Sequence, residues 1–183
     1  MTKKYFGAFP KTLREFFKVG MDRDINSVYY KPEWDVGDDA VILNLGAGMM
    51  KVLENNRVLD WPSWDAESNP IPFKANSVDV INCHHFLEHI QNVIPLIADM
   101  SRVLKSDGVI NITVPYYKSN MAHQDLDHKH TFTETTFKNL LENDYYKKHD
   151  TGGLKVNISI IIGVAERNLA VLIQLVKRNN PIC

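Results

Sequence analysis

Histidine and aspartate are concentrated in one short segment of the chain. Residues 123–130 read His-Gln-Asp-Leu-Asp-His-Lys-His. Imidazole and carboxylate groups are the usual proton acceptors of enzymes and also common metal ligands. We therefore take His123, Asp125 and His128 as the candidate catalytic residues, which would bind a substrate or remove a proton from it.

Two other interpretations of this segment stay open. Its side chains have the chemistry of metal ligands, but the sequence offers no distal ligand set to accompany them. Asp125 or Asp127 could instead pair with the histidines and stabilise the loop. We expect no bound metal, and we keep a metal-dependent hydrolase that uses residues 123–130 as an alternative.

A second chemical feature is a glycine turn followed by two aspartates. Residues 41–45 form an apolar run typical of a buried parallel strand, and the run ends at Gly46-Ala47-Gly48. Glycines permit positive φ and let a ligand approach the backbone. Asp60, at the end of a second short strand, could accept hydrogen bonds from ribose hydroxyls. Asp65 could accept one from the amine of adenine, although an ordinary turn with solvated aspartates would read the same way.

The elements that must position these residues alternate along the chain. Strands alternating with helices and loops favour a mostly parallel sheet, whose ligands bind at the carboxyl ends of the strands. We expect one domain over 1–183, with an extension over 1–39 and a core over 40–183. The expected elements are strands at 41–45, 57–60, 78–83 and 109–115, helices over 10–19, 86–104 and about 133–142, a turn at 106–108, and an antiparallel hairpin of 157–164 and 169–176.

Composition excludes several classes of protein. Hydrophobic residues make up 44% of the 183 residues and charged residues 23%, which is typical of a globular chain. The net charge of −1 gives no bulk attraction to nucleic acid or to anionic membranes. Two cysteines exclude a disulfide framework and favour a reducing, cytoplasmic location. Glu166 and Arg167 interrupt the most apolar stretch, so we expect no membrane span.

The order of these motifs resembles that of a known family. The sequence is similar to class I S-adenosylmethionine-dependent methyltransferases, and most of all to the short methyltransferase type 11 proteins. Residues 116–137 also resemble small phage-encoded members. The motifs that carry the resemblance are Asn44-Leu45-Gly46-Ala47-Gly48, Asp60, Asp65-Ala66-Glu67, residues 72–79 (Pro-Phe-Lys-Ala-Asn-Ser-Val-Asp), Phe86-Leu87-Glu88-His89 and residues 102–108 (Arg-Val-Leu-Lys-Ser-Asp-Gly).

The resemblance implies a fold and a cofactor. The fold is α/β, a Rossmann-like, doubly wound, mostly parallel sheet with an antiparallel C-terminal hairpin and strand order 3-2-1-4-5-7-6. The third strand would fall in residues 68–73, which carry almost no strand signal. The cofactor is S-adenosylmethionine. The implied cofactor-binding residues are Asn44, Gly46, Ala47, Gly48, Asp60, Trp61, Asp65, Ala66 and His84, the last near the methionyl end, while Trp61 and Trp64 could stack on the base or pack on their loop.

The acceptor is not identified by any motif. The Asp/Asn/Ser-Pro-Pro-Tyr motif of DNA amino-methyltransferases is missing, and so is the Pro-Cys nucleophile of carbon-5 cytosine enzymes. Together with the near-neutral charge, this disfavours duplex DNA and favours a small-molecule acceptor. A protein that binds S-adenosylmethionine without transferring a methyl group is the second hypothesis, because its donor pocket would look alike. We expect no membrane partner, and the sequence does not indicate an oligomeric state.

Overall fold

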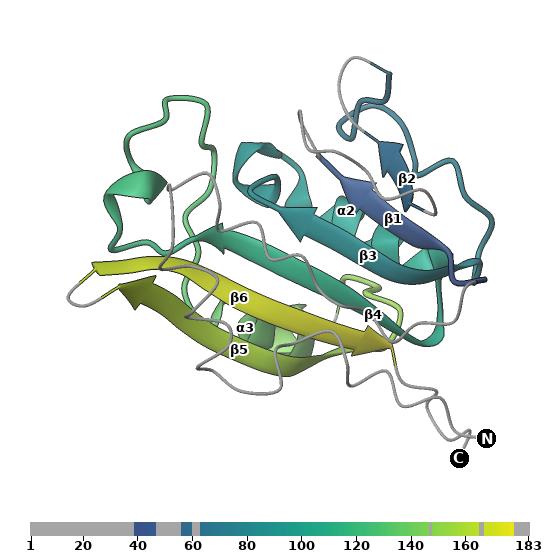
Figure 1. Ribbon diagram of the computed structural model, residues 1–183. Helices are drawn as coiled ribbons and strands as arrows, with labels where there is room; N and C mark the ends of the chain where they lie inside the picture. Colours follow the sequence, from purple (N-terminus) through teal and green to yellow (C-terminus); the bar gives the residue numbers. More distant parts are fainter. Residues whose placement is uncertain (1–38, 47–55, 60–62, 147, 165–166, 178–183) are drawn as a thin grey trace. The chain divides into compact units, whose positions relative to one another are not determined.

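The computed structural model describes residues 39–46, 56–59, 63–146, 148–164 and 167–177 (Figure 1). The predicted helix over 10–19 lies outside these residues, as does nearly all of the predicted extension over 1–39. In the part of the chain that is described, no helix is long and apolar enough to cross a lipid bilayer.

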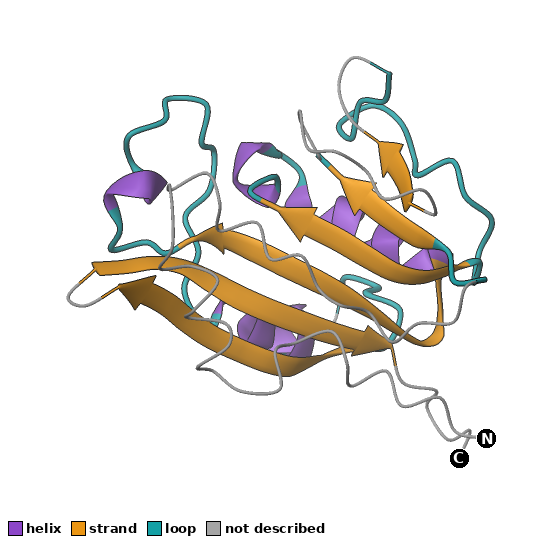
Figure 2. Ribbon diagram, viewed as in Figure 1, coloured by secondary structure: helices purple, strands orange, loops and turns teal. Residues whose placement is uncertain are grey.

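A single sheet of six strands organises the described residues (Figures 1 and 2). Its order is β2-β1-β3-β4-β6-β5. The first four strands in this order run parallel, whereas β6 runs antiparallel to both β4 and β5. The strands are β1 (Ile42–Leu45), β2 (Asn56–Leu59), β3 (Val78–His84), β4 (Leu104–Pro115), β5 (Leu154–Val164) and β6 (Arg167–Lys177). The expected order, direction and C-terminal hairpin are confirmed, without the third strand of the family pattern.

Residues 68–73 form turns and bends instead of that third strand. Their backbone groups bond to the helix α2 (Val93–Val103) and not to a neighbouring strand. Arg102 donates from its two terminal nitrogens to the carbonyl oxygens of Phe73 and Ile71, both at 2.8 Å. Asp99 accepts a hydrogen bond from the Ile71 amide at 2.6 Å. Because α2 satisfies these groups, the segment needs no sheet partner.

The helix predicted over 86–104 is wrong at its start. The chain forms a short 3-10 turn, η3 (Leu87–His89), and α2 begins only after Asn92. Glu67, which is distant in sequence, accepts hydrogen bonds from the backbone amides of Gln91 and Asn92. The first backbone amides of a helix have no hydrogen-bond partner within the helix. A carboxylate that accepts from them therefore stabilises the start of the helix at this position. The other helices of the described residues are α3 (Thr136–Glu142), which ends where the sequence predicts, and the 3-10 turns η4 (Asn120–Ala122) and η5 (Asp144–Tyr146).

The turn predicted at 106–108 is also wrong, because these residues lie within β4. Asp107 has a φ of 65°, so the strand bulges there. Leu104 pairs with Val78, and the next pair is Val109 with Val80. The bulge therefore accommodates the residues of β4 that have no partner on β3, and β4 can follow α2 directly.

The two faces of the sheet differ in chemistry. On one face, successive strands present Leu43, Ile81, Ile110 and Leu175 in one row, and all four are fully buried or nearly so. The same hydrophobic cluster includes Ile97 and Met100 of α2 and Phe137 of α3. Figure 2 shows both helices behind the sheet, on this apolar face.

The opposite face carries a row of side-chain amides that crosses five strands. The hydrogen bonds run in one direction, from Asn157 to Gln174 (2.8 Å), to Asn111 (3.0 Å), to Asn82 (3.0 Å) and to Asn44 (2.8 Å). Each inner amide donates to one neighbour and accepts from the other. We call this row the amide ladder. Its inner members are buried, so each depends on its neighbours to satisfy its polar atoms.

Replacing the central member of the ladder should destabilise the fold. Asn111→Leu keeps the branched shape and the number of side-chain heavy atoms but leaves the Asn82 oxygen and the Gln174 nitrogen without partners, so we expect the free energy of unfolding to fall by at least about 2 kcal/mol. Urea unfolding measures this loss. Asn157→Leu, at the end of the ladder and half-buried, should cost about 1 kcal/mol or less. Equal losses in the two variants would contradict a cooperative row.

Candidate active site

The strand order changes direction at β1. From β1 the chain continues to β2 on one side, while β3 pairs on the other side. In open α/β sheets, ligands bind at such a reversal, outside the carboxyl ends of the strands. β1 ends at Leu45, directly before Gly46, and β3 ends at His84. Two of the predicted cofactor-binding residues therefore lie where this topology places a ligand.

Gly46 is required at its position by its own packing. Its φ is 64°, a backbone conformation that residues other than glycine rarely adopt. A Cβ atom added there would lie 2.2 Å from the ring of Phe86. Phe86 follows β3, so the close contact brings the ends of β1 and β3 together. The sequence predicts Gly46 as part of a ligand-binding turn, and the packing of Phe86 requires a glycine at the same position.

His84 is a neutral imidazole at this edge. Its Nδ1 lies 2.8 Å from the hydroxyl oxygen of Thr113 on β4. Burial, with a smaller contribution from His85, lowers the pKa of His84 to about 4. At neutral pH the side chain is uncharged, so it would not repel a positively charged sulfonium group placed beside it. Asn44, two residues before Gly46, is the last member of the amide ladder.

The loop after β2 approaches the same edge. Trp64 is buried, donates from its indole nitrogen to the Pro70 carbonyl oxygen at 3.1 Å, and has its ring centroid 6.4 Å from that of Phe86. The interpretation of Trp64 as a packing residue is therefore the one that the structure supports. Ala66 also packs against the hydrophobic core.

Asp65 shapes this loop. One of its carboxylate oxygens accepts a hydrogen bond from the Glu67 amide at 2.9 Å, and this bond is the largest influence that lowers the pKa of Asp65. A hydrogen bond with the Ser68 side chain also lowers this pKa, so Asp65 is an ionised turn residue. The remaining predicted cofactor-binding residues, Ala47, Gly48, Asp60 and Trp61, lie outside the described residues.

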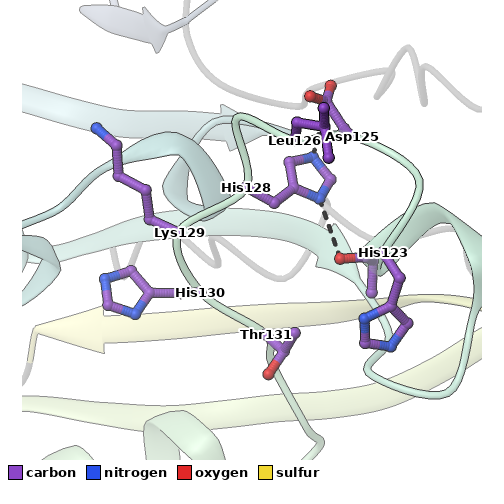
Figure 3. A pocket seen from close by; sticks show the side chains of 8 residues that line it. His123, Asp125, Leu126, His128, Lys129, His130 and Thr131 are labelled. Carbon is purple, nitrogen blue, oxygen red and sulfur yellow. Dashed lines mark hydrogen bonds and ion pairs between the residues drawn. The ribbon is translucent and has the colours of Figure 1, made fainter.

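The predicted catalytic residues line a pocket in the loop after β4. The pocket has a volume of about 320 Å³, and its walls come from residues 122–131 (Figure 3). His123, Asp125 and His128 all contribute to it. The structure therefore brings the three candidates to one pocket, and their catalytic role stays a prediction.

The histidines of this loop are held by different backbone carbonyls. His123 bonds through Nε2 to the Tyr117 oxygen at 2.7 Å, and His130 through Nε2 to the Gln91 oxygen at 3.1 Å. His128 lies 3.3 Å from the Ala122 oxygen through Nδ1 and 3.9 Å from the Asp125 carboxylate through Nε2. Figure 3 shows the imidazoles of His123 and His130 well apart from that of His128. The segment 123–130 therefore does not converge on one ion by itself.

Three loops meet at η3, the turn that follows β3. The amides of Lys129 and His130 both donate to the Glu88 carbonyl oxygen, at 2.7 and 3.3 Å. The Lys129 ammonium lies 3.5 Å from the Glu67 carboxylate, which itself caps α2. The pocket loop is thereby tied to the edge that carries His84. Sequence analysis did not identify Glu67 as a positioning residue, since its partners lie more than twenty positions away.

Comparison with known proteins agrees with this architecture. YcgJ from Bacillus subtilis superposes with a TM-score of 0.55 at 15% identity, over 77% of this chain and 93% of that chain. A SAM-dependent methyltransferase from Methanosarcina mazei gives 0.53 at 14%, over 79% and 95%. The cyclase SpnF gives 0.54 at 10%, over 77% and 75%. The chain has the class I methyltransferase fold.

One family model also matches the sequence. The family described as methyltransferase domain matches residues 26–112, which include β1 to β3, α2 and most of β4. No curated protein matches the sequence. The match to this family model, over slightly less than half of the chain, supports methyl transfer as the activity and S-adenosylmethionine as the cofactor.

Gly46→Val tests the turn at the end of β1. The valine would be strained by the positive φ and would clash with Phe86, so we expect the free energy of unfolding to fall by roughly 2 kcal/mol or more and S-adenosylmethionine binding to be lost. Unfolding in urea and isothermal titration calorimetry measure the two effects. Gly153→Val, at a φ of 75° in the turn before β5, shares the backbone cost and should keep the ligand affinity. Normal S-adenosylmethionine affinity in Gly46→Val would contradict the assignment.

The low pKa of His84 predicts a pH dependence of stability. The folded state disfavours the protonated imidazole of His84, whereas the unfolded chain protonates it at the ordinary pKa of 6.5. The contribution of this histidine to the free energy of unfolding is therefore complete above pH 6.5 and is lost as the pH falls toward about 4. We expect this group to account for a loss of about 1–3 kcal/mol over that window. Urea unfolding at pH 4.5 and 7 should show a smaller difference for His84→Gln than for the wild type. An unchanged difference between the two pH values in His84→Gln would exclude this origin.

Proposed function

We propose that this protein transfers a methyl group from S-adenosylmethionine to a small-molecule acceptor. The observation that carries the proposal is the reversal of strand order at β1, where the Gly46 turn and the neutral His84 meet at the carboxyl edge. A doubly wound sheet binds its nucleotide-like ligands at that point. The donor would be held by the residues predicted from the sequence: Asn44, Gly46, Ala47, Gly48, Asp60, Trp61, Asp65, Ala66 and His84.

The chemistry asks little of the protein beyond alignment. Methyl transfer from a sulfonium is an in-line displacement, so the acceptor atom must be held behind the methyl carbon. The pocket of residues 122–131 is a suitable acceptor site, because its loop is tied to η3 at the same edge as His84. Its volume of about 320 Å³ fits a small molecule rather than a duplex.

His123 is the proposed proton acceptor of this pocket. Its Nε2 donates to the Tyr117 carbonyl oxygen, so the neutral ring carries its lone pair on Nδ1. The side chain is exposed and can reach a bound molecule. Asp125 and His128 would orient the acceptor. One oxygen of Asp125 accepts from the Asp127 amide at 2.9 Å, which fixes the direction of the carboxylate.

A non-catalytic protein that binds S-adenosylmethionine is the second candidate. Its donor pocket would look the same as that of a methyltransferase, and the match to the cyclase SpnF shows that a protein with this fold can be described by a reaction other than methyl transfer. The single-domain organisation over 1–183, the resemblance of residues 116–137 to phage-encoded members and the cytoplasmic location stay predictions from the sequence.

Methyl transfer can be measured without knowing the acceptor. The purified protein is incubated with donor labelled in the methyl group and with cell fractions of small molecules, RNA, DNA and protein. We expect label to enter the small-molecule fraction. A protein that binds the donor in calorimetry but labels no fraction would be the non-catalytic alternative, and one that fails to bind it would contradict the proposal.

The role of His123 has a separate test. His123→Gln should lower kcat for methylation of the cell fraction that the wild type labels. The expected loss is about 100-fold or more, because a general base contributes that much. The dissociation constant of S-adenosylmethionine should not change. His149→Gln, a histidine outside the pocket, is the matched control. Full activity of His123→Gln would assign proton removal to another group.

A further inference from the structure

A cluster of possible metal ligands lies where the pocket loop meets η3. Glu88, His89 and His128 each offer one ligand atom, and these atoms all lie within 4.8 Å of one another. Two of them come from η3 and the third from the loop after β4. The hydrogen bonds from the Lys129 and His130 amides to the Glu88 carbonyl oxygen hold the two segments together. The cluster therefore depends on the tertiary structure and not on a local sequence motif.

The Glu88 carboxylate has an unsatisfied oxygen. The side chain is 1% exposed. Its Oε1 lies 3.3 Å from Nδ1 of His85, whereas its Oε2 is buried without a hydrogen-bond partner. Among the described side chains, it is the only buried polar atom in this state. A buried carboxylate oxygen without a partner is costly, and a bound cation would remove that cost.

The two histidines are prepared to act as ligands. Nδ1 of His128 faces the Ala122 carbonyl oxygen at 3.3 Å, so in the neutral ring Nδ1 carries the hydrogen and Nε2 keeps its lone pair. A carbonyl behind a ligating histidine is the usual outer support of a metal site. The His89 ring lies edge-to-face against that of His128, with centroids 4.8 Å apart. No hydrogen bond joins the His89 ring to another described residue.

We propose that Glu88, His89 and His128 form a binding site for a divalent transition metal ion, Zn²⁺ by the chemistry of the donors. Two imidazoles and one carboxylate are a zinc ligand set that leaves a position open for water or a substrate oxygen. Since His128 also lines the pocket, the ion is beside the proposed acceptor site. His128 then serves as a ligand, and proton removal falls to His123. This site departs from the expectation of no metal and does not depend on methyl transfer.

Zinc binding to the purified full chain tests the site. Metal-free protein competes with a chromophoric chelator for Zn²⁺, and we expect one equivalent to bind and to raise the melting temperature. His89→Gln and His128→Gln should each weaken Zn²⁺ binding by about 100-fold or more, beyond the 10–100-fold typical of a change outside the ligand set. His130→Gln, in the same loop but bonded to Gln91, should bind like the wild type.

Several outcomes would overturn the site. They are no zinc bound in competition with the chelator, wild-type affinity in His128→Gln, and an equal loss in His130→Gln, which would indicate only adventitious binding to surface histidines. Melting of each metal-free variant shows whether it is folded, and the two histidine positions are only partly buried. Unchanged S-adenosylmethionine affinity in His128→Gln, measured in parallel, separates loss of this site from failure of the donor site.

Discussion

The amide ladder sets the register on which the candidate site depends. Strand side chains alternate between faces, so a slip of one residue would move every side chain to the other face and displace the strand ends. Asn44, Asn82 and Asn111 occupy paired positions on β1, β3 and β4. A slip would separate these amides and leave buried polar atoms unpaired. The same register brings Gly46 and His84 to one edge.

The sheet edge shows how packing and ligand binding can require the same residue. The positive φ of Gly46 and its contact with Phe86 are sufficient to exclude any side chain, even without a bound molecule. Phe86 in turn contacts Trp64, so the turn after β1, the loop after β2 and the start of η3 share one aromatic contact. A cofactor bound at this edge would contact residues whose positions are set by packing in the apolar core.

The loops are positioned by acidic residues distant in sequence. Glu67 caps α2, and Asp99 on that helix accepts from the Ile71 amide. Glu88 has a double role, since its backbone oxygen holds the pocket loop and its side chain completes the proposed zinc site. Loops anchored in this way can carry functional groups, while the sheet beneath them supplies the rigidity.

The sequence by itself determined the sheet and the residues that follow its strands. Apolar runs that end at Gly46 and at His84, together with the ordered family motifs, predicted the strand order, the hairpin of β5 and β6, and the weak third strand. The positions of the strands and turns are local features, because hydrophobic periodicity and turn residues act within a few positions. The strand order was implied by the resemblance to the family.

Only the tertiary structure decided how the distant residues meet. The delayed start of α2 depends on Glu67, and the bulge at Asp107 depends on pairing with β3. The loop histidines bond to separate carbonyls, while His128 joins Glu88 and His89 from another element. No local pattern encodes these contacts, because their free energy arises only after the chain has brought separate segments together.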